Sequence, residues 1–408
     1  MRWAVLVAGL VGTGWLLLGH IGGRSDFPFG VPFRATSSPA ALLAPLVAVA
    51  VLVGTCVPGP VARAYTRLPW PLLATVGYLT ALVWSLALLA CRGVPGHGSR
   101  HDPAPLLAGA ARAGDHPLRL FRATPHGDHP PGALLAVWLL RRLGADQPGR
   151  LAVAFCAIGA LVVPLVLASV RSLAGAERAL LPALALLPAL AWAPQTVDAV
   201  PAALGAAAVT CGVVGSERRK PIGRTAPWAL LTGLLLGLLG LCSYLAPALA
   251  VAVICTYFVR RQAALNLLTC LAALPPVALA AHWGFHWTNG LTAARHAARA
   301  AARAGGHSTG QQVLAALLVL LVAGGPALVA AVRGVLRTPG WPFLVGAAAG
   351  VICVLATGVG RADPGGALLP YVPWLVTAAV PARGGPPPLR ATGGGAAGIV
   401  LARLLYPW

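Results

Sequence analysis

Ionisable side chains gather in one polar interval of an otherwise apolar chain, between Cys91 and Gly132. The interval holds three of the nine carboxylates, Asp102, Asp115 and Asp128, together with five of the ten histidines. Groups that exchange protons or bind cations are costly next to a bilayer, and where they occur there they mark functional sites. This interval is therefore the first candidate for the chemistry of the protein.

Two carboxylates at helix boundaries each have two interpretations. Asp128-His129-Pro130 precedes an apolar run, and an Asp shortly before a helix that opens on proline is typical of a cap for free amide groups. Asp198 stands in the same relation to the run that begins at Ala199. The alternative is that these carboxylates, with the imidazole of His129, face a phosphate, a sugar or a metal. The sequence leaves both interpretations open.

Arginines recur at helical spacing in the interval 284–310, at Arg295, Arg299 and Arg303. Residues four apart share one face of a helix. Guanidinium groups on such a face suit a phosphate or pyrophosphate, which they bind through two parallel hydrogen bonds. Contact with lipid headgroups is the other interpretation of the same pattern.

The composition places these groups in a membrane protein. Of 408 residues, 58% are hydrophobic and 10% are charged, against about 25% charged in soluble domains. The net charge of +21 comes from arginines scattered between apolar runs, which excludes a nucleic-acid binder with a basic face. The eight cysteines lie mostly inside apolar runs and lack CxxC spacing, so they predict neither disulfides nor a metal site.

The apolar runs predict an all-α polytopic transmembrane protein with about 13 crossings and a short interfacial helix at 132–143. We expect N-terminal transmembrane helices in 1–69 and the main domain in 70–405. The runs lie at 4–20, 41–57, 70–91, 150–170, 179–193, 199–215, 227–242, 245–259, 263–283, 311–332, 342–358, 367–381 and 393–405.

Arginine placement predicts the orientation in the cell membrane. With the N-terminus cytoplasmic, the basic cluster around Lys220 lies inside and the loop 92–131 lies outside, in agreement with the positive-inside rule. Asp198, Tyr244 and Asp363 then fall on the same external side as this loop. The polar groups without an evident structural role are thus expected on one face.

Four short motifs, in this order, resemble those of GT-C glycosyltransferases, which include protein mannosyltransferases and lipid A aminoarabinose transferases. The resemblance is stronger to a group of actinobacterial polytopic proteins of GT-C type. It covers roughly 70–405 and rests on His-Pro-Pro-Gly at 129–132, Thr-Val-Asp-Ala at 196–199, Cys-Ser-Tyr at 242–244 and Leu-Pro-Tyr-Val-Pro-Trp at 369–374.

This resemblance implies a polyprenyl-phosphate sugar donor and transfer to a cell-envelope glycan, lipid or protein on the external face. A carboxylate of the first large external loop is then the base, with Asp102 as first choice and Asp115 as second. Asp128 and Asp198 would hold substrate or a divalent metal. The remaining substrate-binding candidates are His129, Tyr244, Arg295, Arg299 and Arg361.

One segment departs from the pattern that the resemblance implies. An acidic-x-x-Arg sequence is expected before residue 369; here Asp363 matches the acid, whereas Gly366 stands in place of the arginine, and Arg361 is the nearest replacement. A catalytically inactive scaffold member and a transporter or flippase for a lipid-linked sugar are therefore alternative functions. A flippase would move its substrate without breaking a bond.

Overall fold

The computed structural model is built of helices. It describes residues 42–56, 59–92, 104–122, 129–193, 196–217, 221–304, 308–335, 338–361 and 363–379, and within these ranges it contains no strand. The all-α prediction is therefore confirmed. The α-helices are α2 Leu43–Cys56, α3 Pro60–Arg67, α4 Trp70–Arg92, α5 Ala104–Arg112, α6 Arg119–Arg122, α7 Pro131–Arg142, α8 Pro148–Ala160, α9 Val162–Ala174, α10 Glu177–Ala185, α11 Ala199–Gly215, α12 Ile222–Cys242, α13 Ala250–Val259, α14 Ala264–His282, α15 Trp287–Ala304, α16 Thr309–Gly334, α17 Trp341–Thr357, α18 Pro364–Leu368 and α19 Val372–Leu375.

Five stretches of the described chain are long and apolar enough to cross a membrane: Trp70–Ala90, Pro148–Ala174, Gly223–Cys242, Ala264–His282 and Thr309–Val332. The bent pair α2 and α3 makes a sixth if it is one span, and three further apolar helices are shorter. The chain is a multi-pass membrane protein. The total of about 13 crossings stays a prediction, because the runs 4–20 and 393–405 lie outside the described residues.

Two runs expected to cross are broken into short helical pieces rather than forming one continuous helix. In 179–193, α10 ends at Ala185 and a 3-10 turn, η2, follows at Pro188–Ala191; in 367–381 the chain forms α19 and the turn η5 at Val376–Ala379. Proline lacks an amide hydrogen and fits best in the first turn of a helix, where Pro188 begins η2 and Pro373 is the second residue of α19. Every side chain of 179–193 is buried in the protein, so this run does not face lipid.

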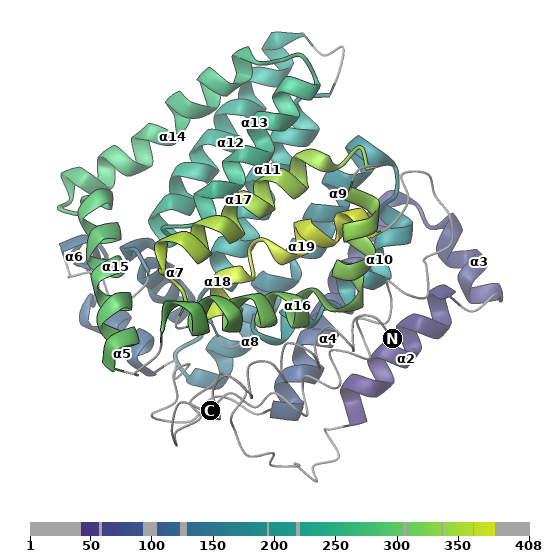
Figure 1. Ribbon diagram of the computed structural model, residues 1–408, viewed down its shortest axis with the longest axis horizontal. Coiled ribbons are helices and arrows are strands. Elements are labelled where there is room, and N and C mark those ends of the chain that lie inside the picture. Colours follow the sequence, from purple (N-terminus) through teal and green to yellow (C-terminus); the bar gives the residue numbers. More distant parts are fainter. Residues whose placement is uncertain are drawn as a thin grey trace.

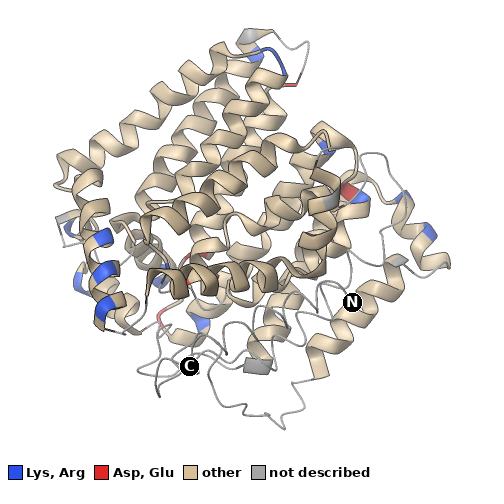
Figure 2. Ribbon diagram, viewed as in Figure 1, with Lys and Arg blue, Asp and Glu red and all other residues tan. Residues whose placement is uncertain are grey.

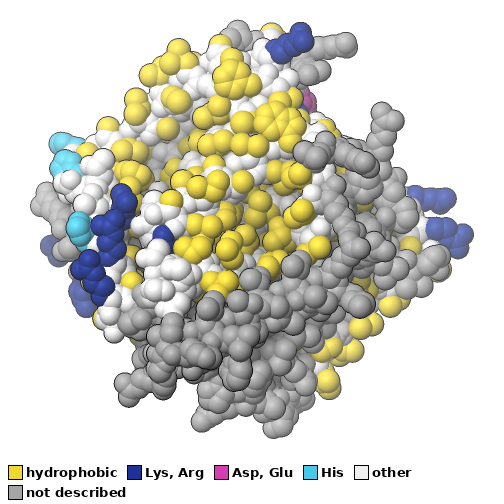
Figure 3. Space-filling view, in the orientation of Figure 1, with side chains coloured by type: hydrophobic (Ala, Val, Ile, Leu, Met, Phe, Trp, Pro, Cys, Tyr) yellow, Lys and Arg dark blue, Asp and Glu magenta, His cyan; other side chains and the backbone are white. Residues whose placement is uncertain are grey.

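Helices α12 and α14 pack along each other over most of their length (Figure 1). Gly233 and Gly237, four residues apart on α12, allow this approach, because a Cβ at either position would overlap the carbonyl oxygen of Thr269 or Ala273. Small residues at this spacing bring helix backbones together in membranes. The outer face of α14 exposes Leu267, Leu271 and Leu274, part of the apolar surface in Figure 3 that suits lipid.

Replacement of Gly233 by alanine is expected to lower the stability of the protein by about 1–3 kcal/mol. The added methyl group meets backbone, which cannot rotate away as a side chain could. Thermal unfolding in detergent measures the effect. Gly223→Ala is the matched control on the same helix, since nothing lies within 4 Å of its Cβ position. Equal melting temperatures for the two variants would contradict this account of the helix contact.

A buried arginine ties three helices together at the end of α11 that lies away from Asp198. Arg260, which follows α13, donates to Ser172 Oγ at 2.8 Å and to the carbonyl oxygens of Ser172 in α9 and Val213 in α11. These carbonyls lie in the last turns of their helices, where intrahelical partners run out. The contact fixes α11 against its neighbours, and so fixes where the opposite end of α11 presents Asp198.

Candidate functional site

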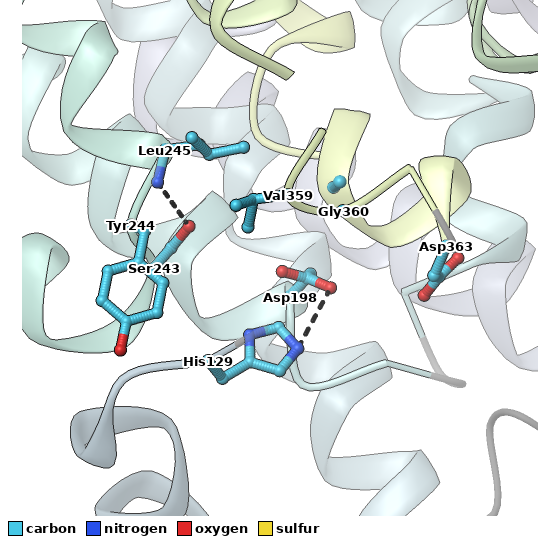
Figure 4. Close-up of a pocket in the computed structure, with 9 residues that line it drawn as sticks. His129, Asp198, Ser243, Tyr244, Leu245, Val359, Gly360 and Asp363 are labelled. Carbon is cyan, nitrogen blue, oxygen red and sulfur yellow. Dashed lines mark hydrogen bonds and ion pairs between the residues drawn. The ribbon is translucent and has the colours of Figure 1, made fainter. Parts of the chain in front are cut away.

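Four segments far apart in the sequence meet at one open pocket. They are the segment before α7, the residue before α11, the segment after α12 and the connection from α17 into α18 (Figure 4). Because two carboxylates line it, we call it the acidic pocket. Its lining residues are His129, Asp198, Ser243, Tyr244, Leu245, Val359, Gly360, Asp363 and Ala367.

Asp198 is buried and faces the pocket rather than capping its helix. It occupies the cap position of α11, yet its side chain makes no capping hydrogen bond and only 5% of the residue is exposed. Its Oδ2 atom lies 3.9 Å from Nε2 of His129, which points toward it in Figure 4. The Nδ1 atom of His129 is buried and has no hydrogen-bond partner among the described residues. The capping interpretation of Asp198 is therefore wrong.

Asp363 brings a second carboxylate to the same place. Its Oδ1 atom accepts a hydrogen bond of 3.2 Å from the amide of Gly366 and so caps the short helix α18. A Cβ at Gly366 would overlap Oδ2 of Asp198 and would lie 2.8 Å from Oδ2 of Asp363. The two carboxylates thus converge over Gly366. A larger residue at position 366, such as the arginine expected there, would have to displace these oxygens.

The His-Pro-Pro-Gly motif holds His129 in place through a close backbone approach. Helix α7 begins at Pro131, with Pro130 as its cap residue, and a Cβ at Gly132 would overlap the carbonyl oxygen of Leu241 near the end of α12. Glycine is therefore needed where α7 crosses α12. The expected short helix at 132–143 is present as α7.

The segment after α12 is shaped by its own side chains. Ser243 Oγ accepts hydrogen bonds from the amides of Leu245 and Ala246, at 3.3 and 3.2 Å, where the 3-10 turn η3 (Ala246–Leu249) begins. Tyr244 is 4% exposed, and its ring packs edge-on against Trp287 of α15 with the centroids 5.8 Å apart. This packing joins the acidic pocket to α15.

A second, larger pocket is lined by three arginines. Two of them come from α15, which forms the helix expected in 284–310 and carries its arginines as successive bands in Figure 2. We call it the arginine pocket. Its lining residues are Ala298, Arg299, Ala302, Arg303, Thr309, Gln312, Ala356, Thr357, Gly358 and Arg361.

The connection from α17 to α18 is a wall of both pockets. Gly358 and Arg361 line the arginine pocket, whereas Gly360 and Asp363 line the acidic pocket. The turn needs glycine, because φ is +81° at Gly358 and +75° at Gly360, a region that other residues rarely adopt. Arg361 donates to the carbonyl oxygen of Leu355, and its Nε atom is buried with no hydrogen-bond partner among the described residues.

Other residues singled out in the sequence are placed elsewhere. Asp102 and Asp128 lie outside the described residues, so the roles expected of them stay predictions. The carboxylate of Asp115 is 82% exposed and pairs with Arg142, and Asp115 lines neither pocket. Arg295 lies one turn before Arg299 on α15, is partly buried and lines neither pocket.

A metal site does not emerge from the described residues. No three of their His, Cys, Asp or Glu side chains are arranged to hold a metal ion. Asp198, Asp363 and His129 are close, but they do not form such a group. We therefore derive no step through a metal.

Comparison with known proteins finds a distant structural likeness. No family model matches the chain, and no curated protein does. Among solved structures, it is similar to ArnT from Cupriavidus metallidurans in the apo state and bound to undecaprenyl phosphate, with a TM-score of 0.47 and 15% identity in both cases. The match covers 76% of this chain but only 58% and 59% of those chains, less than two thirds of their length.

Proposed function

We propose that this protein is a membrane glycosyltransferase that moves a sugar from a polyprenyl-phosphate donor to a cell-envelope acceptor. The observation that carries the proposal is the pair of pockets of opposite charge that share the wall 358–363. A glycosyl transfer needs cations where the phosphate departs and a base where the acceptor hydroxyl attacks. The arginine pocket offers the cations and the acidic pocket offers the base, on opposite sides of the connection between α17 and α18.

The donor phosphate belongs in the arginine pocket. A polyprenyl-phosphate sugar carries a phosphodiester with one negative charge, and Arg299, Arg303 and Arg361 offer guanidinium groups suited to its oxygens. The polyprenyl chain would lie along the apolar, membrane-facing surface. The sugar would then reach past the shared wall toward the carboxylates.

The acceptor hydroxyl belongs in the acidic pocket. Its oxygen attacks the anomeric carbon, the bond from that carbon to the phosphate oxygen breaks, and the phosphate leaves with the bonding electrons. The hydroxyl proton passes to a carboxylate. Among the described acids we assign this role to Asp198, because Asp363 is already engaged in capping α18. The base roles expected of Asp102 and Asp115 stay competing predictions.

The sidedness is part of the proposal. The arginine pattern supports a cytoplasmic N-terminus and an external position for both pockets, where an envelope glycan, lipid or protein would be the acceptor. Cysteine labelling in intact cells tests this arrangement. External labelling of a cysteine placed at position 220 would overturn it.

Reconstitution tests the activity itself. Purified protein in vesicles is supplied with radiolabelled polyprenyl-phosphate sugars and an extract of envelope acceptors, and label in the acceptor is measured. Transfer supports the proposal. A donor that moves to the other leaflet and stays intact identifies a flippase. A donor that neither moves nor reacts with any acceptor indicates a scaffold. Either result would refute the proposed transferase activity.

A further inference from the structure

The arginine pocket has more positive charge than one phosphodiester can neutralise. Three guanidinium groups line it, and no Asp or Glu is among its lining residues. The first turn of α16 and the last turn of α17 both reach it, so the partial charges of these two helix ends are opposite in sign and tend to cancel. The arginine side chains therefore set the charge of this site.

The described structure leaves that charge uncompensated. Arg299 and Arg303 make no ion pair with the described residues, whose pairs are His129–Asp198, Arg142–Asp115 and Arg150–Asp146. Arginines four apart on a helix repel each other, and α15 has them at 295, 299 and 303. Figure 3 shows these side chains as a dark blue band along one edge of the molecule.

Burial of one of the three arginines adds to the electrostatic free energy of the cluster. Arg361 is partly buried, and this desolvation lowers the pKa of its guanidinium below the ordinary value. A charged group in such a place gains more from a nearby anion than an exposed one does. A ligand with two negative charges compensates the three arginines better than a ligand with one.

The proposed reaction changes the charge of the ligand in this pocket. Cleavage of the glycosyl bond converts a phosphodiester with one charge into a phosphate monoester, whose second pKa is about 6. The monoester is thus a dianion at neutral pH. A pocket that stabilises charge as it develops on the departing phosphate also holds the product of that step.

Resting on the proposed function, we propose that the arginine pocket binds the spent carrier, a polyprenyl phosphate monoester dianion, more tightly than the loaded donor. Release of the spent lipid then limits turnover. A reaction that removes this lipid from the outer leaflet, by transport or by renewed loading, must accompany the transfer.

The test compares two lipids in nanodiscs at pH 8: polyprenyl phosphate and its methyl phosphodiester. The monoester is expected to bind at least about tenfold more tightly, since one further charge-assisted contact contributes that much. At pH 5 the preference is expected to shrink, because the monoester then carries one charge. Equal affinities at pH 8, or a preference that does not depend on pH, would overturn the inference.

Variants locate the preference in the pocket. Arg299→Gln and Arg303→Gln are expected to reduce it to about threefold or less, whereas Arg299→Lys, which keeps the positive charge, is expected to keep the preference for the dianion. Arg224→Gln removes a charge from an exposed position in the first turn of α12 and is the control, expected to leave it unchanged. An equal loss in Arg224→Gln would show a general charge effect and overturn the assignment.

Two competitors separate the possible sources of the dianion. Inorganic phosphate and phosphatidic acid present the same group without the polyprenyl chain. Displacement of the carrier by an equimolar amount of either would overturn the assignment to the carrier. A transfer assay in the same nanodiscs separates this inference from the proposed function: transfer with equal binding refutes only the inference, whereas absence of transfer refutes the function.

Discussion

Asp198→Asn is expected to reduce the transfer rate by about a hundredfold to ten-thousandfold, the usual effect of removing a positioned base. Asparagine keeps the shape of the side chain but cannot take up the acceptor proton. Because the Asp198 side chain does not cap α11, helix α11 is expected to form as before. Single-turnover transfer in vesicles measures the rate, and the melting temperature in detergent checks the fold.

The matched control is Asp146→Asn. Asp146 pairs with Arg150 at 3.1 Å, and the carboxylate is 53% exposed and outside both pockets. An exposed ion pair contributes little, so near-normal rate and stability are expected. Asp102→Asn, Asp115→Asn and Asp128→Asn belong in the same series. A normal rate in Asp198→Asn with a large loss in Asp102→Asn would move the base to the external loop.

Gly366→Ala is expected to lower the transfer rate by about a hundredfold while leaving the protein folded. The methyl group would occupy the place where Oδ2 of Asp198 and Oδ2 of Asp363 now converge. These atoms end short side chains that can rotate aside, so the cost falls on the geometry of the site and little on stability. Displacement of a reacting group by about 1 Å is enough for a loss of this size.

Steady-state kinetics and thermal unfolding together test this second variant. A lower kcat with an unchanged melting temperature is expected. Gly223→Ala, which adds the same methyl group in open space, is the control. Normal activity in Gly366→Ala would mean that the convergence of the two carboxylates has no part in the reaction.

The sequence predicted those features that depend on local periodicity. The apolar runs predicted the long helices α4, α12, α14 and α16, and arginine spacing predicted α15. Breaks within an apolar run were harder to predict. The run 179–193 is apolar almost throughout, and the break in its helix depends on Pro188 and on burial by the surrounding helices. Length and composition alone could not distinguish such a broken, buried segment from a continuous helix that faces lipid.

The two pockets show where local patterns stop being informative. The motifs pointed to His129, Asp198 and Tyr244, which the fold does bring together. They could not show that Asp198 turns away from the helix that it precedes, because that depends on contacts between remote segments. The roles of Thr357, Gln312 and Gly360 as lining residues were missed, and only the Gly-Val-Gly spacing at 358–360 gave a local signal.

The shared turn at 358–363 has a thermodynamic consequence. If a ligand in one pocket shifts this turn, the shift changes the affinity of the other pocket, and linkage requires the effect to be equal in both directions. If bound donor raises the affinity for the acceptor by some factor, bound acceptor raises the affinity for the donor by the same factor. After transfer, the coupling acts between the glycosylated product in the acidic pocket and the spent carrier in the arginine pocket. If each favours binding of the other, loss of one speeds loss of the other; if each opposes it, the ligand that remains is bound more tightly once the other has left.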